Sequence, residues 1–336
     1  MREPSFWWRE PRARARPMAS LLAPLGALYG AIAAHRLDQK GARAGVRVVC
    51  IGNLTVGGAG KTPTAIAAAR LLQAAGARPV FLTRGYGGRL AGPVAVTPAH
   101  GAADIGDEPL LLARDAPTIV ARDRVAGARA AEAAGADVIV LDDGFQNPSL
   151  AKDFSLIVVD GRRGLGNHRV FPAGPLRAPL RRQLAHAQAL LVVGEVGAAA
   201  QGAIEAARAR GLPVFGGRLV PDPATVASLA GRAALAFAGI ADPEKFFATL
   251  RAAGIAVRAT HGFPDHHRFG AEEAHDLIAR AERAGLVLVT TEKDLARMQG
   301  DPALAALARR AIALPVALAF DDAESIGRLL AAVRAA

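Results

Sequence analysis

A glycine-rich turn that ends in lysine and threonine is the segment of this sequence best suited to chemistry. Residues 57–62 read Gly-Gly-Ala-Gly-Lys-Thr and stand between an apolar run at 46–52 and an alanine-rich stretch. In such a loop the backbone N–H groups surround phosphate oxygens, the lysine reaches the β- and γ-phosphates, and the threonine hydroxyl binds Mg²⁺. We therefore expect a nucleoside triphosphate and Mg²⁺ to bind at Thr55, Gly57, Gly58, Ala59, Gly60, Lys61 and Thr62.

The loop departs from the usual P-loop pattern at its start. Thr55 occupies the position where G-x-x-x-x-G-K-[ST] has its first glycine, and the preceding glycine is Gly52. Pro63 is compatible with the first turn of the following helix, because an N–H at that position has no helical partner. We expect the phosphate site to form in spite of this departure.

Two adjacent carboxylates are the candidates for binding the metal from a second strand. Asp142 and Asp143 come at the end of an apolar run, and P-loop enzymes hold Mg²⁺ with a carboxylate in that place. Like charges so close repel each other unless a cation or hydrogen bonds compensate. An ordinary surface turn is the alternative interpretation of this Asp-Asp-Gly sequence.

Apolar runs that alternate with alanine-rich stretches indicate how these residues are positioned. The runs are rich in β-branched residues and lack polar alternation, which is typical of strands buried on both faces of a parallel sheet. Strands alternating with helices predict a doubly wound, mostly parallel α/β fold, here of the P-loop NTPase type. The runs lie at 46–52, 78–85, 117–121, 137–144, 154–161 and 189–195.

A second, smaller α/β domain is expected after an extended, proline-containing linker at 213–222. Further apolar runs alternate with helical stretches there, and they lie at 234–243, 255–263, 286–294 and 312–320. We place the boundary between 212 and 232, and assign 41–215 to a P-loop domain and 216–336 to the smaller domain. A site between the two domains would require them to close over it and exclude water.

The amino-terminal segment combines basic and apolar residues. Residues 18–34 carry no charge, arginines stand at 12, 14 and 16, and Trp7 and Trp8 precede them. We expect residues 1–40 to form a membrane-associated helix that lies on or dips into the cytoplasmic leaflet, with tryptophans at the interface and arginines on anionic headgroups. A secretory signal and a buried first helix are the alternatives.

Charge and composition exclude several classes of function. The net charge is +11, of which residues 1–47 contribute +6 and residues 160–182 contribute +5. This concentration indicates two surfaces for anions, and we expect no nucleic-acid partner. The single cysteine, Cys50, excludes a disulfide framework and a cysteine-based metal site. Nothing in the sequence indicates an obligate protein partner.

A series of short motifs, taken together, resembles the tetraacyldisaccharide 4′-kinase family. The segment from Gly52 to Pro63 is the first of them, and the series continues to about residue 295, through most of the chain. The others are Arg84-Gly85-Tyr86-Gly87, Gly106-Asp107-Glu108-Pro109, Leu141-Asp142-Asp143-Gly144-Phe145-Gln146, Pro172-Ala173-Gly174-Pro175-Leu176-Arg177, Pro264-Asp265-His266 and Thr291-Glu292-Lys293-Asp294.

The resemblance implies transfer of the γ-phosphate of ATP to the 4′-hydroxyl of tetraacyldisaccharide 1-phosphate, which gives lipid IVA at the cytoplasmic face of the inner membrane. It implies Asp107 as the base, His266 as its partner and Lys61 as a further catalytic residue. Glu108 would join Thr62, Asp142 and Asp143 near the metal, and Arg84, Gln146 and Arg177 would contact the substrate. The arginines within 160–182 would have its phosphate to pair with.

Two positions depart from the family pattern, and a neighbouring residue competes with one assignment. Asn147 stands where the family usually has histidine, and Ala178 stands where it usually has glutamate. His267 is adjacent to His266, so either imidazole could face the base.

Two other functions remain as alternatives. A P-loop NTPase switch of the partitioning or metallochaperone type would use the same loop and act through a protein partner, although the lysine expected before its paired glycines is Val56 here. A membrane-anchored module that merely holds nucleotide would explain the loop and the amino-terminal helix, but not Gly-Asp-Glu-Pro.

Overall fold

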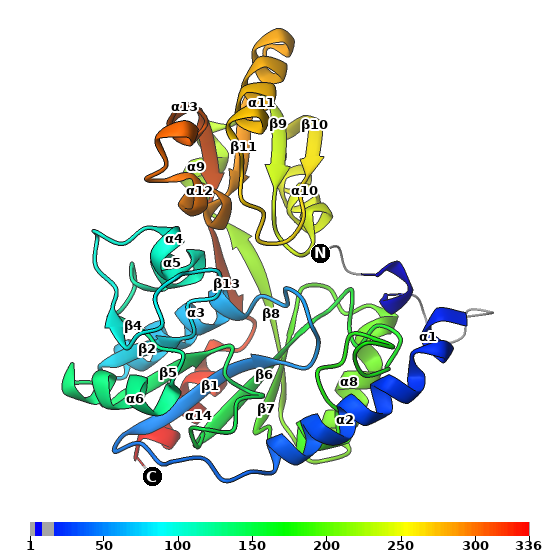
Figure 1. Ribbon diagram of the computed structural model, residues 1–336, viewed down its shortest axis with the longest axis vertical. Coiled ribbons are helices and arrows are strands. Elements are labelled where there is room, and N and C mark those ends of the chain that lie inside the picture. The colour runs from blue at the N-terminus through cyan, green and yellow to red at the C-terminus, as the bar shows by residue number, and fades with distance from the viewer. Residues whose placement is uncertain (1–3, 9–16, 336) are drawn as a thin grey trace.

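The chain forms two α/β units, each built on its own sheet (Figure 1). The computed structural model describes residues 4–8 and 17–335. Within these residues, the larger unit contains a nine-stranded sheet in the order β13-β8-β7-β6-β1-β5-β2-β4-β3, and the smaller unit a four-stranded sheet in the order β10-β9-β11-β12. The predicted α/β class is confirmed.

The larger sheet is parallel except at its two edges, where β13 pairs with β8 and β3 pairs with β4 in antiparallel fashion. Its seven central strands in the order above, from β8 to β4, are mutually parallel, as the continuous apolar runs predict. The strands are β1 (Arg47–Asn53), β2 (Pro79–Thr83), β3 (Val94–Ala95), β4 (Thr118–Val120), β5 (Val138–Asp142), β6 (Phe154–Asp160), β7 (Ala189–Val193), β8 (Val214–Pro221) and β13 (Val316–Phe320).

Helices cover both faces of the larger sheet, which makes it doubly wound. On one face, α3 (Lys61–Ala74) and α14 (Ala323–Ala335) pack on the sheet. The other face is covered by α6 (Arg124–Ala133), α7 (Leu180–Ala185) and α8 (Ala198–Arg208). Two short helices, α4 (Ala102–Ile105) and α5 (Asp107–Leu112), stand above the carboxyl ends of the strands and approach the smaller unit.

The smaller sheet is entirely parallel and also has apolar side chains packed on both faces. Its strands are β9 (Ala233–Ala238), β10 (Ala256–Gly262), β11 (Val287–Thr291) and β12 (Ala311–Leu314). The helices of this part of the chain are α9 (Pro223–Ser228), α10 (Pro243–Ala252), α11 (Ala271–Ala284), α12 (Glu292–Met298), the 3₁₀ turn η2 (Pro302–Leu304) and α13 (Ala305–Arg310).

The connection between the units differs from the expected domain limits. The segment expected as a linker is β8, an integral strand of the larger sheet, and β13 returns to pair with it. The apolar run at 312–320 is therefore two strands in two sheets, and Pro315, which has no N–H to donate, separates them. Residues 316–335 thus belong by pairing and packing to the larger unit, whereas the expected division placed 216–336 together.

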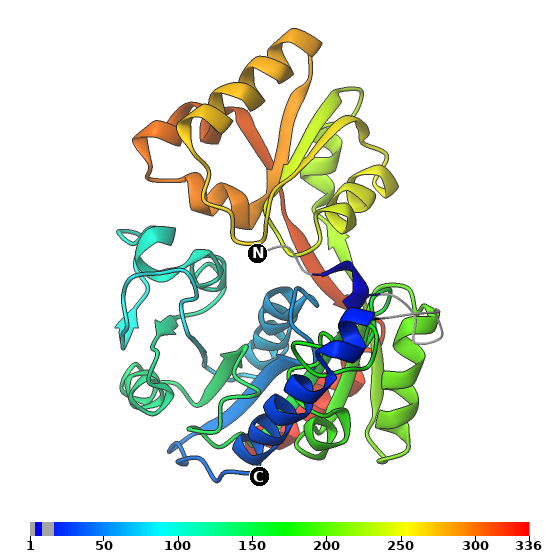
Figure 2. The same ribbon diagram turned by 45° about the vertical axis from the view of Figure 1, so that its right-hand side comes forward.

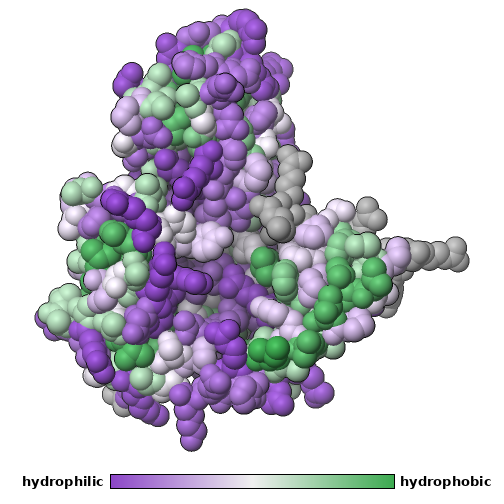
Figure 3. All heavy atoms as spheres, in the orientation of Figure 1, coloured by the Kyte–Doolittle hydropathy of each residue, from purple (hydrophilic) through white to green (hydrophobic). Residues whose placement is uncertain are grey.

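The amino-terminal segment forms helices along the outside of the larger unit (Figure 2). A 3₁₀ turn, η1 (Ser5–Trp7), precedes α1 (Pro17–Leu21) and α2 (Ala23–Leu37). Gly26 and Gly30 lie against the segment 170–179, where a Cβ on Gly26 would stand 2.9 Å from the carbonyl oxygen of Val170. The opposite face of α2 is apolar and exposed, as Figure 3 shows. Leu28 on this face, for example, is 63% exposed.

One expectation about this segment changes. Trp7 does not lie at a lipid interface, because its side chain is buried and its Nε1 donates to the carbonyl of Pro172 at 3.0 Å. Among the described residues, no helix is long and apolar enough to span a bilayer. The arginines at 12, 14 and 16 lie outside the described residues.

Truncation of Leu277, which is fully buried in the smaller unit, should lower stability. We expect Leu277→Ala to decrease the free energy of unfolding by about 2–5 kcal/mol, because it removes apolar contacts and leaves a cavity. Urea denaturation followed by circular dichroism measures this. Leu25→Ala is the matched control, since Leu25 is exposed, and an equal loss from both variants would contradict the assignment of Leu277 to a core.

Candidate functional site

The glycine-rich loop connects β1 to α3 at the carboxyl edge of the larger sheet. Gly57 and Gly60 have φ values of 104° and 93°, which glycine adopts readily. Asn53, the last residue of β1, donates from Nδ2 to the carbonyls of Thr55 and Gly57 at 2.7 and 3.1 Å. These two hydrogen bonds from a buried amide hold the loop in position. No role was assigned to Asn53 from the sequence. The loop and the start of α3 line the cavity described below.

Asp142 and Asp143 end β5 beside this loop and have different electrostatic environments. Thr62 Oγ1 donates to Asp142 at 3.3 Å, while Lys61 and Arg177 face Asp143 at 3.6 and 3.1 Å. Burial, with the charges of Glu108 and Asp143, raises the pKa of Asp142 to about 7. Burial also opposes ionisation of Asp143, but Lys61 and Arg177 outweigh it and lower its pKa to about 2. The pair therefore contains one buried carboxyl group, Asp142, whose charge nearby cations compensate only in part.

The oxygen atoms here fit a magnesium ion. Asp142 Oδ1 is buried and has no hydrogen-bond partner within residues 4–8 and 17–335. Among those same residues, no three or more His, Cys, Asp or Glu side chains converge on a point, so the protein does not form a complete cage. Magnesium suits such a place, because it binds through one or two carboxylates and completes its shell with phosphate oxygens and water.

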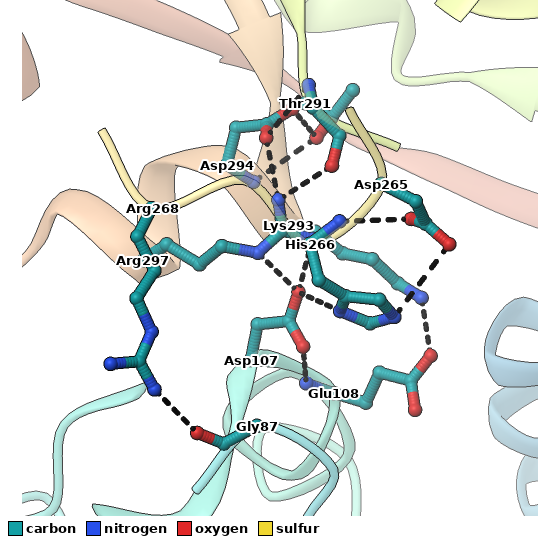
Figure 4. A network of polar contacts seen from close by, with 11 residues as sticks. Gly87, Asp107, Glu108, Asp265, His266, Arg268, Thr291, Lys293, Asp294 and Arg297 are labelled. Carbon is teal, nitrogen blue, oxygen red and sulfur yellow. Dashed lines mark hydrogen bonds and ion pairs between the residues drawn. The ribbon is translucent and has the colours of Figure 1, made fainter. Parts of the chain in front are cut away.

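Asp107 begins α5 and is buried at the junction between the units. Its side chain is 3% exposed and its Oδ1 accepts from the N–H of Glu108 at 3.0 Å. Its Oδ2 accepts from Arg297 Nε at 2.7 Å and faces His266 Nδ1 at 3.8 Å (Figure 4). Burial alone would raise the pKa of Asp107, but the charges of Arg297, Lys293 and His266 outweigh it, so the pKa is lowered and the group is ionised.

Of the two adjacent histidines, His266 faces this carboxylate. Its ring lies 4.7 Å from the ring of Tyr86, which comes from the larger unit. The ring of His267 instead stacks on Phe263 at 4.6 Å and its Nε2 lies 2.8 Å from Glu273. The structure therefore brings Asp107 and His266 together from different units, as the predicted pairing requires, although 3.8 Å is too long for a hydrogen bond.

Helix α12 supplies two cations to which sequence reasoning gave no role. Lys293 Nζ lies 2.6 Å from Glu108, which raises the pKa of Lys293 against the effect of its burial. Arg297 contacts Asp107 from the next turn of the same helix. Their spacing of four residues, which places both on one helix face, is the signal by which the sequence could have identified them.

The residues expected to contact substrate divide into two groups. Arg84 is exposed and lines the cavity. Arg177 is engaged with Asp143 and donates to the carbonyl of Thr55 at 3.0 Å, and Gln146 donates to the carbonyl of Asn53 at 2.7 Å. Arg177 and Gln146 thus brace the phosphate loop.

The two family departures lie close to these side chains. Ala178 is buried, and the Oδ1 of Asn147 accepts from the N–H of Ser149. Because alanine and asparagine are both uncharged, neither replacement places a charged group beside Arg177.

The arginines within 160–182 are largely occupied by groups of the chain itself. We expected these arginines to pair with a phosphate of the substrate. In the structure most of them instead contact carboxylates or a carbonyl of the chain. Arg162 and Arg163 pair with Asp242, Arg169 donates to the carbonyl of Ala19, Arg177 pairs with Asp143 and Arg182 pairs with Asp38. The carboxylates that neutralise them are distant in sequence, so the net charge of the segment did not reveal the pairing.

A cavity of about 1240 Å³ joins these parts. Lys61, Thr62, Asp142, His266, Lys293 and Arg84 line its polar portion. Apolar side chains of α3, β8, α10 and β13 line another portion, among them Ile66, Leu219, Phe246 and Val316. The volume is sufficient for a nucleotide and part of a second substrate.

Over most of its length, the chain is similar to known members of one kinase family. The family model for tetraacyldisaccharide-1-P 4′-kinase matches residues 18–334. The tetraacyldisaccharide 4′-kinase of Rhodopseudomonas palustris (strain BisB18) is 58% identical over 327 residues, 97% of this chain and 94% of the relative. That of Methylobacterium sp. (strain 4-46) is 58% identical over 99% of this chain and 98% of the relative. A crystal structure of LpxK from Aquifex aeolicus in complex with ATP has a TM-score of 0.72 at 27% identity and covers 94% of this chain and 99% of that one.

Gly106, which precedes Asp107, should not tolerate a side chain. Its φ is 88°, and a Cβ would lie 2.3 Å from the carbonyl oxygen of Tyr86. We expect Gly106→Ala to destabilise the fold by at least about 1 kcal/mol, because left-handed backbone is costly for alanine and α5 must shift. Thermal unfolding measures this. Gly101→Ala is the control, since the nearest atom to its Cβ is 3.9 Å away; indistinguishable variants would contradict the close contact.

Proposed function

The chain belongs to the tetraacyldisaccharide-1-P 4′-kinase family, and from this premise we propose that it transfers the γ-phosphate of ATP to the 4′-hydroxyl of tetraacyldisaccharide 1-phosphate, giving lipid IVA. One observation carries the proposal for this site. Asp107 is an ionised carboxylate with the imidazole of His266 3.8 Å away, and that imidazole lines the same cavity as the phosphate loop. A kinase that acts on an alcohol needs both a triphosphate site and a proton acceptor.

The switch function is not favoured. A switch needs the phosphate loop and a surface that responds to hydrolysis, but it has no use for a buried carboxylate and histidine at the place where an acceptor would enter. The relatives at 58% identity that match nearly the whole chain are named as kinases.

The side chains suggest how transfer proceeds. Asp107 accepts the proton of the sugar hydroxyl as the oxygen forms a bond to the γ-phosphorus, while the bond from that phosphorus to the β-phosphate oxygen breaks and ADP leaves. His266 orients the carboxylate, and its 3.8 Å separation would shorten when substrate is bound. Lys61 and the loop amides stabilise charge on the transferred group. Magnesium, when bound by Asp142 and Thr62 with Glu108 nearby, neutralises phosphate charge.

The exposed apolar face of α1 and α2 suggests how a lipid substrate is reached. We propose that this face lies on the anionic cytoplasmic surface of the inner membrane, so that the protein is peripheral. Its exposed side chains are Met18, Leu21, Leu25, Leu28, Tyr29 and Ile32, and the exposed ring of Phe171, from the neighbouring segment, lies 5.3 Å from that of Tyr29. The basic residues Arg36, Lys40 and Arg43 follow it, and cations beside an apolar helix face favour anionic headgroups.

Replacement of the transfer residues should abolish lipid phosphorylation without unfolding the chain. We expect Asp107→Ala to lower kcat by about 10²–10⁴-fold, the usual contribution of a general base, and Lys61→Ala to lower it by at least about 10²-fold. Transfer of ³²P from ATP to the disaccharide lipid, with and without Mg²⁺, measures this. Asp276→Ala is a control at an exposed carboxylate.

Three outcomes of this assay would oppose the proposal. Phosphate release by the wild-type protein without lipid labelling would favour the switch. Near-normal labelling by Asp107→Ala would remove that residue as the base, and full activity after Mg²⁺ is chelated would exclude the metal.

Charge on the apolar face should release the protein from membranes. We expect the double variant Leu25→Glu and Leu28→Glu to bind vesicles containing phosphatidylglycerol at least about tenfold more weakly, since each leucine contributes about 1.5–3 kcal/mol when buried in an apolar medium. Co-flotation measures the bound fraction. Val196→Glu, an exposed apolar position elsewhere, is the control, and unchanged flotation of the double variant would refute this orientation.

A further inference from the structure

The guanidinium of Arg297 lies at the junction of the two units and contacts both. It projects from α12 of the smaller unit, and its side chain is 9% exposed. Nε and Nη2 lie 2.7 and 2.5 Å from Oδ2 of Asp107, which belongs to the larger unit. Nη1 donates to the carbonyl of Gly239 at 2.7 Å and to Asp294 at 2.9 Å. One planar group therefore spans three acceptors.

The carbonyl of Gly239 connects this group to His266. It also accepts the backbone N–H of His266 at 3.1 Å. His266 has a φ of 53°, which is uncommon for a residue other than glycine and requires support from its surroundings. Arg297 thus touches the side chain of Asp107 (Figure 4) and, through the carbonyl of Gly239, the backbone acceptor that fixes His266.

Asp294 holds the side chain of Arg297 in place. Asp294 is fully buried, and its Oδ1 accepts from Arg297 and from the N–H of Gly239 at 3.0 Å. Its Oδ2 accepts from the hydroxyl of Thr291 at 2.6 Å. Since a guanidinium presents its donors in a fixed fork, these contacts determine its plane, and a lysine could not satisfy the same three acceptors.

We propose that Arg297 is the positioning residue of the Asp107–His266 pair. It acts through Asp107 and Gly239, holding the carboxylate and the histidine loop in one geometry. This inference rests on the proposed kinase function, since the pair has a task only if Asp107 accepts a proton. Because the cation stands on one unit and the base on the other, the base is oriented only where α12 meets α5.

A purely mechanical role at the interface is the competing explanation. Helix α12 makes another ion pair there, between Glu292 and Arg114 at 2.6 Å, at an exposed edge. This pair joins α12 to the turn that follows α5, without contacting Asp107 or Gly239. Arg114→Ala is therefore the matched control, because it removes an interfacial cation and leaves the Asp107–His266 pair untouched.

Steady-state kinetics on the full-length protein separate the two roles. We expect Arg297→Ala to lower kcat by about 100-fold, the effect of misplacing a reacting group by about an ångström, with little change in KM for ATP or lipid. Arg297→Lys should not recover this loss, because an ammonium group lacks the planar fork of donors. Added guanidinium should restore kcat of Arg297→Ala about tenfold, whereas ammonium should not, because only a planar fork refits the site. Arg114→Ala should resemble wild type.

A double-variant cycle adds a second readout. In an Asp107→Asn background, Arg297→Ala should cause little further loss of kcat, because residues that act as a unit are not additive. Multiplicative losses, absence of rescue by guanidinium, or an equal decrease in Arg114→Ala would overturn the proposal.

Crystal structures of wild type and Arg297→Ala decide the geometry without an activity assay. The carboxylate of Asp107 or the loop of His266 should move in the variant; unchanged positions of both would refute the inference. Failure of wild type to label the disaccharide lipid would instead refute the proposed function. The two failures are therefore distinguishable.

Discussion

A buried carboxylate is stable as an anion only if cations reach it, and Asp107 receives its cations from the other unit. Lys293 and Arg297 stand on α12, while Asp107 and Glu108 stand on α5. Removal of charge from water costs several kcal/mol unless a close partner compensates. The position of the smaller unit against the larger one is therefore linked to the ionisation of Asp107, the proposed base, and most of the candidate site depends on this contact.

Asp142 and Asp143 show the same dependence on nearby cations, because one of these two carboxyl groups forms ion pairs and the other does not. Asp143 pairs with Lys61 and Arg177 and stays ionised, whereas Asp142, one residue earlier, forms no ion pair within residues 4–8 and 17–335 and has one oxygen without a hydrogen-bond partner there. A buried oxygen of this kind suits a divalent cation that arrives with the nucleotide. Of these two neighbouring aspartates, Asp143 forms internal ion pairs, and Asp142 has an oxygen suited to an external cation.

The sequence was informative where function depends on local backbone and uninformative where it depends on distant partners. The loop at 57–62 and the runs of the parallel sheet follow from spacing and side-chain type alone. The partner of Arg297 does not, because its spacing from Lys293 places both cations on one helix face but does not indicate that a carboxylate 190 positions away lies opposite. The return of β13 to the larger sheet was missed for a related reason, since an apolar run does not reveal which sheet it joins. The arginines of 160–182 were expected to be free because their partners, Asp38, Asp143 and Asp242, lie on other elements.

The close packing of α2 on the larger unit has a consequence for where catalysis would occur relative to a membrane. Gly26 and Gly30 let this helix lie directly on the segment 170–179, and that segment contacts the phosphate loop on its other side, where the N–H of Val56 donates to the carbonyl of Pro175 at 2.8 Å. Only one layer of chain separates the apolar helix from the nucleotide site. If the helix rests on lipid, the height of the transferred phosphate above the acyl chains is a fixed dimension of the fold, and the sugar headgroup must rise to that height.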